Sequence, residues 1–432
     1  MKHDLHRPVA AGLILAALLI NKWTLLLAGF GGGRIDNRLL ALALVAIPML
    51  AAGLGIIILL AKPRLTAGYL LYIALLAIIF GYGGSIWFRS WKFYNYITDE
   101  HRRGWRGQAH IPDAEFGLKP KPGVYAAHIF PVGADIPMHF DNWGFRVPVD
   151  TAGRALPLKR PLLLFLGCSF TYGDACRAED AFPFLTAQAL GGTELNRGVC
   201  SWGLAQMMLD GERLLAEFQP DWLVVQYSPW LVERALGGMA PLYYGHCPVP
   251  YFIQRDGTLN LQPPPFGWKA GTLPVNDYDG AAGHGRFLSF LSRIGLPLYL
   301  YDDFNMSRLF AARMLGILPP CTLDRRAVVR TVYNQLAEAA HKHGSRMVAL
   351  RLTGGFKNPG DDEWAEILKI PDIITVDAEA ALLDSLPATG LDYNHAYKHW
   401  RGEPPVMVDG HPNPPAHRII AGAIVRVMGY GL

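Results

Sequence analysis

Long uninterrupted apolar segments open the chain, and short apolar runs that alternate with amphipathic stretches follow them. Leu39–Ala61 is 23 residues without a charge, and Leu65–Phe88 is another 24. Because an α-helix needs about 20 apolar residues to cross the hydrocarbon layer, both segments are predicted to span a membrane, paired as a hairpin through Lys62-Pro63-Arg64. Pro8 to about Phe30 predicts a third span or, behind Lys2 and Arg7, a signal peptide.

Buried strands and amphipathic helices alternate from Pro161 onward. Such alternation predicts a parallel sheet covered by helices on both faces. Expected strands are 162–166, 221–226, 347–352 and 373–376, with a short one before Gly198. Expected helices are 181–190, 204–218, 327–343 and 416–428. The sequence therefore predicts an α/β domain over residues 161–432, behind a transmembrane segment of two to three helices in residues 1–93.

Two segments fall outside this alternation, one before it and one within it. Residues 94–160 are rich in turns and are predicted to be a connector with extended pieces. Residues 236–320 are rich in Pro, Gly and aromatic side chains, and are predicted to be an insertion able to cover a site. Within the insertion, Tyr251–Leu261 predicts a hairpin that turns at Asp256-Gly257.

Composition and charge narrow the classes of protein. Hydrophobic residues make up 51% of the chain and charged residues 18%, against about 25% charged in an average soluble domain. This composition excludes an intrinsically disordered protein, and the net charge of +4 gives no case for nucleic-acid binding. Basic residues are concentrated just after the third apolar segment, at 89, 92, 102, 103 and 106. By the positive-inside rule, that side of the membrane and the domain that follows would be cytoplasmic.

Ser169 is the first candidate for chemistry. The apolar run 162–166 ends in Gly167-Cys168-Ser169, and Gly173 follows four residues after the serine. Ligands of parallel α/β sheets bind beyond the carboxyl ends of the strands, so this position favours a nucleophile. A serine that caps a helix is the structural alternative.

Asp409 and His411 form the second candidate, on a loop just before the last predicted helix. A serine hydroxyl needs a base to take its proton, and a carboxylate orients the histidine that serves as that base. The alternatives are an ordinary Asp-Gly-His-Pro-Asn turn and a metal site that would include His417. Gly198 is a third candidate, because a glycine after a short strand can present its N–H to an oxyanion; an ordinary turn explains it equally well.

Together, these segments resemble the SGNH/GDSL family of serine hydrolases, over roughly residues 140–230 and 345–430. Gly167–Gly173 is similar to the nucleophile block, with Cys168 where Asp is most common, and Asp409–Asn413 is similar to the last block. The Asn142–Arg146 turn resembles that of membrane-anchored members. The resemblance implies a flavodoxin-like, three-layer α/β/α fold. It further implies a triad of Ser169, His411 and Asp409, with the amides of Ser169 and Gly198 as oxyanion donors and no cofactor or metal.

The third block departs from the family pattern of Gly-x-Asn, whose asparagine donates to the oxyanion. Ser228 and Trp230 stand in those positions, and loss of one such donor costs about 2.7–4 kcal/mol in the transition state. Gln226, Ser228 or the indole N–H of Trp230 are the candidate replacements. Cys168 is an alternative nucleophile, although adjacent side chains of a strand-to-turn segment should point apart, which favours Ser169.

The function this resemblance implies is a membrane-anchored ester hydrolase, an O-acyl (acetyl) esterase acting on a cell-envelope carbohydrate or another acylated small molecule. The alternatives are an O-acyltransferase with the same acyl-enzyme and a non-catalytic polysaccharide-binding subunit. The latter would use aromatic residues at 230, 243, 244 and 268. The resemblance places the protein in the lipid bilayer of a bacterial inner membrane, with the catalytic domain outside the cytoplasm, against the charge distribution. A disulfide between Cys176 and Cys200 is a further hypothesis.

Overall fold

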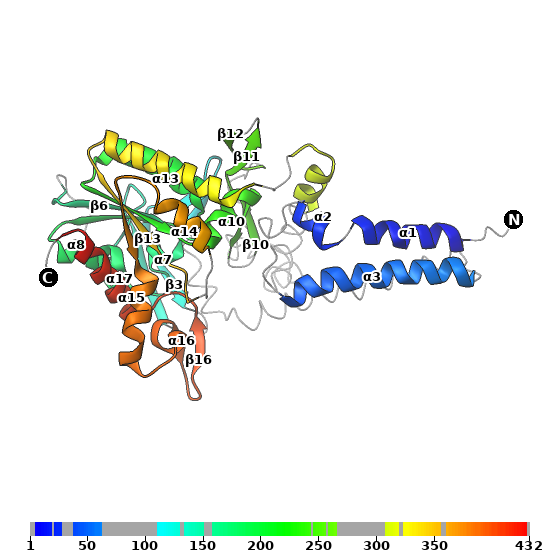
Figure 1. The fold of residues 1–432 in the computed structure, drawn as a ribbon. Coiled ribbons are helices and arrows are strands. Elements are labelled where there is room, and N and C mark those ends of the chain that lie inside the picture. The colour runs from blue at the N-terminus through cyan, green and yellow to red at the C-terminus, as the bar shows by residue number, and fades with distance from the viewer. Residues whose placement is uncertain are drawn as a thin grey trace, which may run out of the picture. The chain divides into compact units, whose positions relative to one another are not determined.

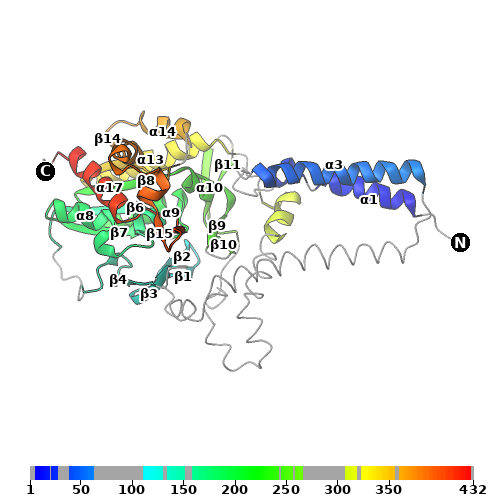
Figure 2. The ribbon, with the colours of Figure 1, turned by 90° about the horizontal axis from the view of Figure 1, so that it is seen from below.

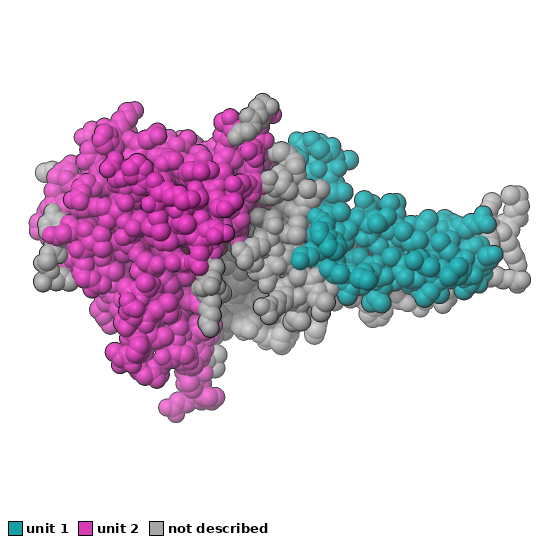
Figure 3. Space-filling view, viewed as in Figure 1, with its two compact units in different colours: residues 1–95, 290–322 teal, residues 96–289, 323–432 magenta. Residues whose placement is uncertain are grey.

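The chain forms two compact units, residues 1–95 with 290–322 and residues 96–289 with 323–432 (Figure 3). The computed structural model describes residues 5–19, 21–27, 38–62, 110–129, 134–150, 158–242, 245–255, 258–265, 307–318, 323–355 and 360–429. The predicted second span, Leu65–Phe88, lies outside these residues, as do Tyr243, Tyr244 and Trp268.

The first unit contains two apolar helices that lie side by side, α1 (His6–Leu19) and α3 (Arg38–Ala61) (Figures 1 and 2). A Cβ added to Gly55 of α3 would lie 2.9 Å from the carbonyl oxygen of Ala10 in α1, so the glycine permits close packing. Leu44–Ala61 is the one helical segment in the described part of the chain that is long and apolar enough to cross a membrane.

The segment predicted as one span from Pro8 to about Phe30 is divided into two helices at Asn21. The Asn21 side chain donates to the carbonyl oxygen of Leu18 (2.6 Å) at the end of α1. Its Oδ1 accepts hydrogen bonds from the backbone amides of Trp23 and Thr24, which caps the separate short helix α2 (Lys22–Leu27). At 14 residues, α1 is shorter than a membrane-spanning helix.

A five-stranded, fully parallel sheet organises the second unit. Its strand order is β14-β13-β8-β6-β7. The strands are β6 (Leu162–Gly167), β7 (Thr193–Gly198), β8 (Trp222–Tyr227), β13 (Arg346–Arg351) and β14 (Ile373–Asp377). In chain order this arrangement is 2-1-3-4-5, the flavodoxin-like topology, with its switch point between β6 and β8. The predicted fold class is confirmed.

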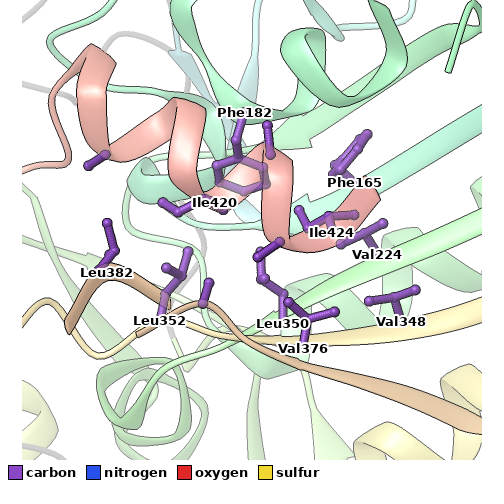
Figure 4. Packing of buried hydrophobic residues seen from close by; sticks show 14 of the residues in the cluster. Phe165, Phe182, Val224, Val348, Leu350, Leu352, Val376, Leu382, Ile420 and Ile424 are labelled. Atoms are coloured by element: carbon purple, nitrogen blue, oxygen red, sulfur yellow. The ribbon is translucent and has the colours of Figure 1, made fainter. Parts of the chain in front are cut away.

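One face of the sheet packs against the last helix of the chain. The strands contribute alternate residues such as Phe165, Val224 and Leu350, which meet Ile420 and Ile424 of α17 (Figure 4). The helices that contribute to this cluster are α8 (Phe182–Ala189), α15 (Ala378–Ser385), α16 (Tyr393–Tyr397) and α17 (Pro414–Val427). Each buried aliphatic or aromatic side chain in such a layer contributes about 1.5–3 kcal/mol through removal from water.

The opposite face of the sheet is covered by α9 (Leu204–Phe218) and α13 (Arg325–Lys342). A Cβ on Gly211 of α9 would lie 2.7 Å from Leu166 of the sheet and 2.8 Å from Leu336 of α13. Glycine at this position therefore lets the helices and the sheet pack closely. The remaining helices of this unit are α7 (Ser169–Tyr172), α10 (Pro229–Gly237) and α14 (Asp361–Ile367), with short 3₁₀ turns at Ala178–Asp180 and Leu386–Thr389.

Small antiparallel sheets precede and follow the parallel one. The pairs are β1 (His110–Asp113) with β2 (Gly117–Pro120), β9 (Met239–Leu242) with β10 (Gly245–Pro248), β11 (Tyr251–Arg255) with β12 (Thr258–Gln262), and β15 (His399–Arg401) with β16 (Val406–Asp409); β3 (Gly123–Ile129), β4 (Ala134–Phe140) and β5 (Arg146–Val147) form a three-stranded sheet. The hairpin predicted over Tyr251–Leu261 is present as β11 and β12. Phe116 and Leu118, from the predicted connector, are buried beside Trp202.

Candidate active site

Ser169 lies at the switch point of the sheet, directly beyond the carboxyl end of β6. Ser169 is the first residue of α7. The N–H groups at the start of a helix have no carbonyl acceptor within that helix, so the Ser169 N–H is available to another acceptor. Gly167 is needed before it, because a Cβ there would lie 2.0 Å from Thr171 Oγ1. Ser169 retains 9% exposure, whereas Cys168 is fully buried.

Asp409 is the last residue of β16, and His411 follows it on the loop before α17. His411 Nδ1 donates to Asp409 Oδ1 at 2.7 Å, and the same oxygen accepts from the backbone amide of His411 at 2.7 Å. Although burial raises the pKa of Asp409, the hydrogen bond and charge of His411 lower it overall. Asp409 is therefore ionised and fixes the orientation and tautomer of the imidazole.

Asn413 fastens this loop to the rest of the unit. Its Nδ2 donates to the carbonyl oxygens of Ala396 (2.9 Å) and Lys398 (3.0 Å), while its Oδ1 caps α17 through the amide of Ala416. The Asn413 amide in turn donates to the carbonyl oxygen of Tyr397. The asparagine of the last sequence block thus holds His411 in place through backbone bonds.

Phe170 connects the serine segment with the histidine loop. Its ring packs edge-on against His411, with centroids 5.4 Å apart, and against Trp230 at 5.1 Å. Within the described residues Ser169 Oγ is not hydrogen-bonded to His411; it lies 3.9 Å from Cys168 Sγ. The expectation that the Cys168 and Ser169 side chains point apart is therefore wrong. Catalytic hydrogen bonds of free enzymes are often long and tighten only when substrate binds.

Asp174 is a member of the site that the sequence did not single out. Its Oδ2 lies 3.9 Å from His411 Nε2 and accepts a hydrogen bond from Cys200 Sγ at 3.6 Å. Although burial lowers the pKa of His411, the hydrogen bond and charge of Asp409 and the charge of Asp174 raise it to about 9. In the sequence, the only feature that could have pointed to Asp174 was its position, one residue after Gly173 of the nucleophile block.

The Gly198 amide donates to Asn196 Oδ1 at 3.0 Å. The predicted role as an oxyanion donor therefore requires that this hydrogen bond be exchanged for one to the substrate. Glycine is required there for a different reason, because a Cβ would lie 2.2 Å from the backbone nitrogen of Tyr172. Gly198 thus lets β7 approach α7, the helix that carries Ser169.

The three candidate replacements for the missing asparagine occupy different surroundings. Gln226 and Ser228 are fully buried; Gln226 Nε2 donates to Ser228 Oγ (2.8 Å), which donates to the carbonyl oxygen of Leu352. Their hydrogens are committed inside the protein. Trp230 is only partly buried, and its Nε1 lies 3.4 Å from Cys168 Sγ, beside Ser169.

The Cys168 thiol lies among hydrogen-bond donors. Although burial raises the pKa of Cys168, the charge of Arg234 and the N–H groups of Trp230, Phe170 and Gln226 lower it overall. These groups stabilise negative charge next to Ser169. Because Cys168 has no exposed surface, Ser169 remains the better placed nucleophile.

Arg146, the last residue of the Asn142–Arg146 turn, holds the loop after α7. Its buried guanidinium donates to the carbonyl oxygens of Tyr172 (2.7 Å), Gly173 and Cys176. It also stacks on the Tyr172 ring, 4.3 Å from the centroid. This turn therefore supports the segment that contains Ser169 and Asp174.

His417 joins two helices of the α/β unit. Its Nδ1 accepts the Phe182 amide at 3.2 Å, joining α17 to α8, and burial lowers its pKa to about 3. No group of three or more His, Cys, Asp or Glu side chains suited to a metal ion occurs in the described part of the chain.

The hypothesis of a Cys176–Cys200 disulfide is wrong for this structure, in which both residues are free. Cys200 Sγ bonds to Asp174. Cys176 Sγ donates to the carbonyl oxygen of Pro412 at 3.6 Å, next to His411.

No family model matches the sequence, and no similar curated protein is found. Solved structures with a similar fold include a lipolytic protein of the G-D-S-L family from Desulfitobacterium hafniense (10% identity, 62% of this chain and 99% of that one, TM-score 0.30). A second is the α/β hydrolase LAE5 from the metagenome of Lake Arreo (10% identity, 63% of this chain and 97% of that one, TM-score 0.34). A third is a variant of Axe2, an acetyl xylan esterase from Geobacillus stearothermophilus (14% identity, 63% of this chain and 97% of that one, TM-score 0.33). The chain has the flavodoxin-like parallel sheet that the resemblance implied. At these identities the likeness concerns the fold alone.

The raised pKa of His411 predicts an alkaline pH profile for any reaction in which it acts as a base. Only neutral imidazole accepts a proton, so kcat/KM is expected to rise with pH and level off above about 9. Asp174→Asn removes one charge that raises this pKa, and is expected to move the rising limb to lower pH. The same shift stabilises the folded state fully below pH about 6.5, and this contribution is lost as pH rises through about 9.

The measurement is kcat/KM against pH for the wild type and Asp174→Asn, with Asp362→Asn as a control on the exposed first turn of α14. A profile that does not move in Asp174→Asn would contradict the assigned electrostatics.

Proposed function

We propose that the chain is a serine hydrolase of ester bonds. The observation that carries the proposal is the His411–Asp409 hydrogen bond of 2.7 Å, on a loop whose imidazole packs against the residue following Ser169. A partly buried, ionised carboxylate that fixes a histidine beside a serine at the switch point of a parallel sheet is the arrangement that activates a serine hydroxyl.

In the proposed reaction, Ser169 Oγ attacks the ester carbonyl carbon while its proton moves to His411 Nε2. The oxyanion that forms accepts the Ser169 N–H from the first turn of α7, with the Trp230 indole N–H as the second donor. Collapse of the intermediate breaks the ester bond, and His411 returns the proton to the leaving alcohol. Water then attacks the acyl-Ser169 ester with His411 again as base, releasing the acid and restoring the hydroxyl.

For Nε2 to receive this proton, the His411 ring must move so that Nε2 turns from Asp174 toward Ser169 Oγ. The 3.9 Å separation of Nε2 from Asp174 is longer than a hydrogen bond, so little is lost in that movement. The Asp409 bond to Nδ1 is kept throughout.

The test is hydrolysis of 4-nitrophenyl acetate by the purified protein. The wild type is expected to turn over the ester, Ser169→Ala is expected to lose activity by about 10⁴-fold or more, and Ser385→Ala on α15 is expected to retain it. Cys168→Ala is expected to keep Ser169-dependent turnover. Equal rates for the wild type and Ser169→Ala would contradict the proposal and would favour a non-catalytic binding protein.

The natural substrate we propose is an O-acylated, in particular O-acetylated, carbohydrate. The support is the family resemblance and the aromatic wall made by Phe170 and Trp230 beside Ser169, since aromatic rings stack on sugar faces. Product that forms only when a glycan acceptor is added would instead identify an acyltransferase.

We also propose that α3 anchors the protein in a membrane, with the α/β unit outside the cytoplasm. Within α3, Leu50 is 73% exposed and Leu60 77%, and large apolar surface of this kind is normally covered by lipid or protein. Retention in the membrane fraction after alkaline extraction is the expected result, and release into the soluble fraction would contradict anchoring. A reporter fused after Leu432 then decides the side.

A further inference from the structure

Lys398 is a buried cation at the edge of the candidate active site. The residue is 7% exposed and directly follows α16. Its Nζ lies 5.2 Å from the centroid of the Phe170 ring and 5.7 Å from that of the Tyr393 ring. The Phe170 ring that it faces is the one packed against His411 and Trp230.

No acidic side chain in the described part of the chain forms an ion pair with this ammonium group. Glu379 is close enough to influence it, but Glu379 Oε2 already accepts the amides of Thr353 (2.9 Å) and Gly354 (3.0 Å), and Oε1 accepts that of Gly355 (2.8 Å). Burial lowers the pKa of Lys398, and the charges of Glu379 and Asp409 only partly oppose this. Removing a cation from water without a paired anion is costly.

The backbone of Lys398 is fixed to the histidine loop. Its N–H donates to the carbonyl oxygen of Asn394 at 3.0 Å, and its carbonyl oxygen accepts from Asn413 Nδ2 at 3.0 Å. Asn413 is two residues after His411. The position of the cation is therefore set by the same contacts that place the proposed catalytic base.

We propose that Lys398 binds a carboxylate carried by the substrate, so that the protein acts on acyl esters of acidic molecules, such as an acylated acidic saccharide. This inference rests on the proposed function. Two aromatic rings attract the cation but leave its hydrogen-bonding capacity unused, because the ring faces offer no lone pairs. An ammonium group has three donors and one charge, which matches a single carboxylate; a doubly charged phosphate would require further cations.

The experiment uses two matched probes, the acetate esters of 4-hydroxybenzoic acid and of 4-hydroxybenzamide, which differ in charge but are similar in shape. The kcat/KM for each is measured with the wild type, Lys398→Met and Lys398→Arg. Lys369→Met, which removes an exposed lysine of similar type, is the matched control. For each protein, kcat/KM of the charged ester is divided by kcat/KM of the neutral ester. Comparing this ratio between variants cancels the difference in intrinsic reactivity between the two esters.

Lys398→Met is expected to lower this ratio about 10- to 100-fold relative to the wild type, the range for a hydrogen bond to a charged group. The loss is expected mainly in KM of the charged ester, with the neutral ester changed by less than about threefold. Lys398→Arg is expected to keep most of the preference, and Lys369→Met all of it.

Two results overturn the inference. An unchanged ratio in Lys398→Met, including an equal loss for both esters, would assign Lys398 a purely structural role. Ser169-dependent hydrolysis of the neutral ester would then leave the proposed function standing. Absence of Ser169-dependent hydrolysis of either ester by the wild type would overturn the proposed function and this inference with it.

Discussion

Replacing Asp409 with asparagine is expected to lower kcat by about 10⁴-fold. The carboxylate accepts the Nδ1–H of His411 at 2.7 Å and contributes to the raised pKa of that histidine. An amide of the same shape can donate to Nδ1 and so stabilise the tautomer that carries its proton on Nε2, where the proton of Ser169 must go. The steady-state rate of 4-nitrophenyl acetate hydrolysis measures this loss.

Asp362→Asn is the matched control, since it changes the same group on an exposed helical turn. Its kcat is expected to equal that of the wild type. A reduction of less than about tenfold in Asp409→Asn, with folding intact by circular dichroism, would show that Asp409 does not orient the base.

Replacing Arg146 with methionine is expected to lower the free energy of unfolding by about 3–4 kcal/mol. The guanidinium donates to three carbonyl oxygens of the Tyr172–Cys176 loop. The oxygens of Tyr172 and Gly173 keep a second donor, Asn196 Nδ2 and the Cys176 amide, so each of these two losses costs about 0.5–1.5 kcal/mol. The Cys176 oxygen loses the donor that the described residues provide, which costs about 1–3 kcal/mol. Methionine fills much of the same volume, so the loss isolates these bonds. Urea unfolding followed by tryptophan fluorescence measures the change.

Arg326→Met is the matched control. Arg326 is exposed on α13 and makes only a 3.7 Å ion pair with Asp324, and exposed pairs contribute about 0–1 kcal/mol. Equal effects of the two substitutions would contradict the role of Arg146. Because Asp174 belongs to the loop that Arg146 holds, the kcat of Arg146→Met is also expected to fall.

The parallel sheet was predictable because its strands are buried on both faces. Runs such as 162–166 and 222–225 are apolar at every position, which distinguishes them from strands with one wet face. The pairing of Asp409 with His411 was predictable for a similar reason, since two residues on one loop meet through local geometry alone.

Contacts between distant segments were not predictable. The turn after Ser169 brings Asp174 to His411, which is far away in sequence. Lys398, directly after α16, places its ammonium group over the ring of Phe170, which is equally distant in sequence. Gly198 was predicted to be an amide donor to the oxyanion. The structure explains why this residue is glycine in another way, because a side chain there would meet the backbone of Tyr172. Hydropathy likewise could not show that the Asn21 side chain ends α1, because one polar residue hardly changes the average of an apolar segment.

The most direct test of the central claim, that Ser169 is an activated nucleophile, is to map the adduct formed with a fluorophosphonate probe. The purified wild-type protein is treated with the probe, digested and analysed by mass spectrometry, with His411→Ala treated in parallel. The account predicts one adduct per chain, on the Ser169 hydroxyl, and its loss in His411→Ala. An adduct on Cys168 or on another serine, or no adduct in the folded wild-type protein, would contradict it.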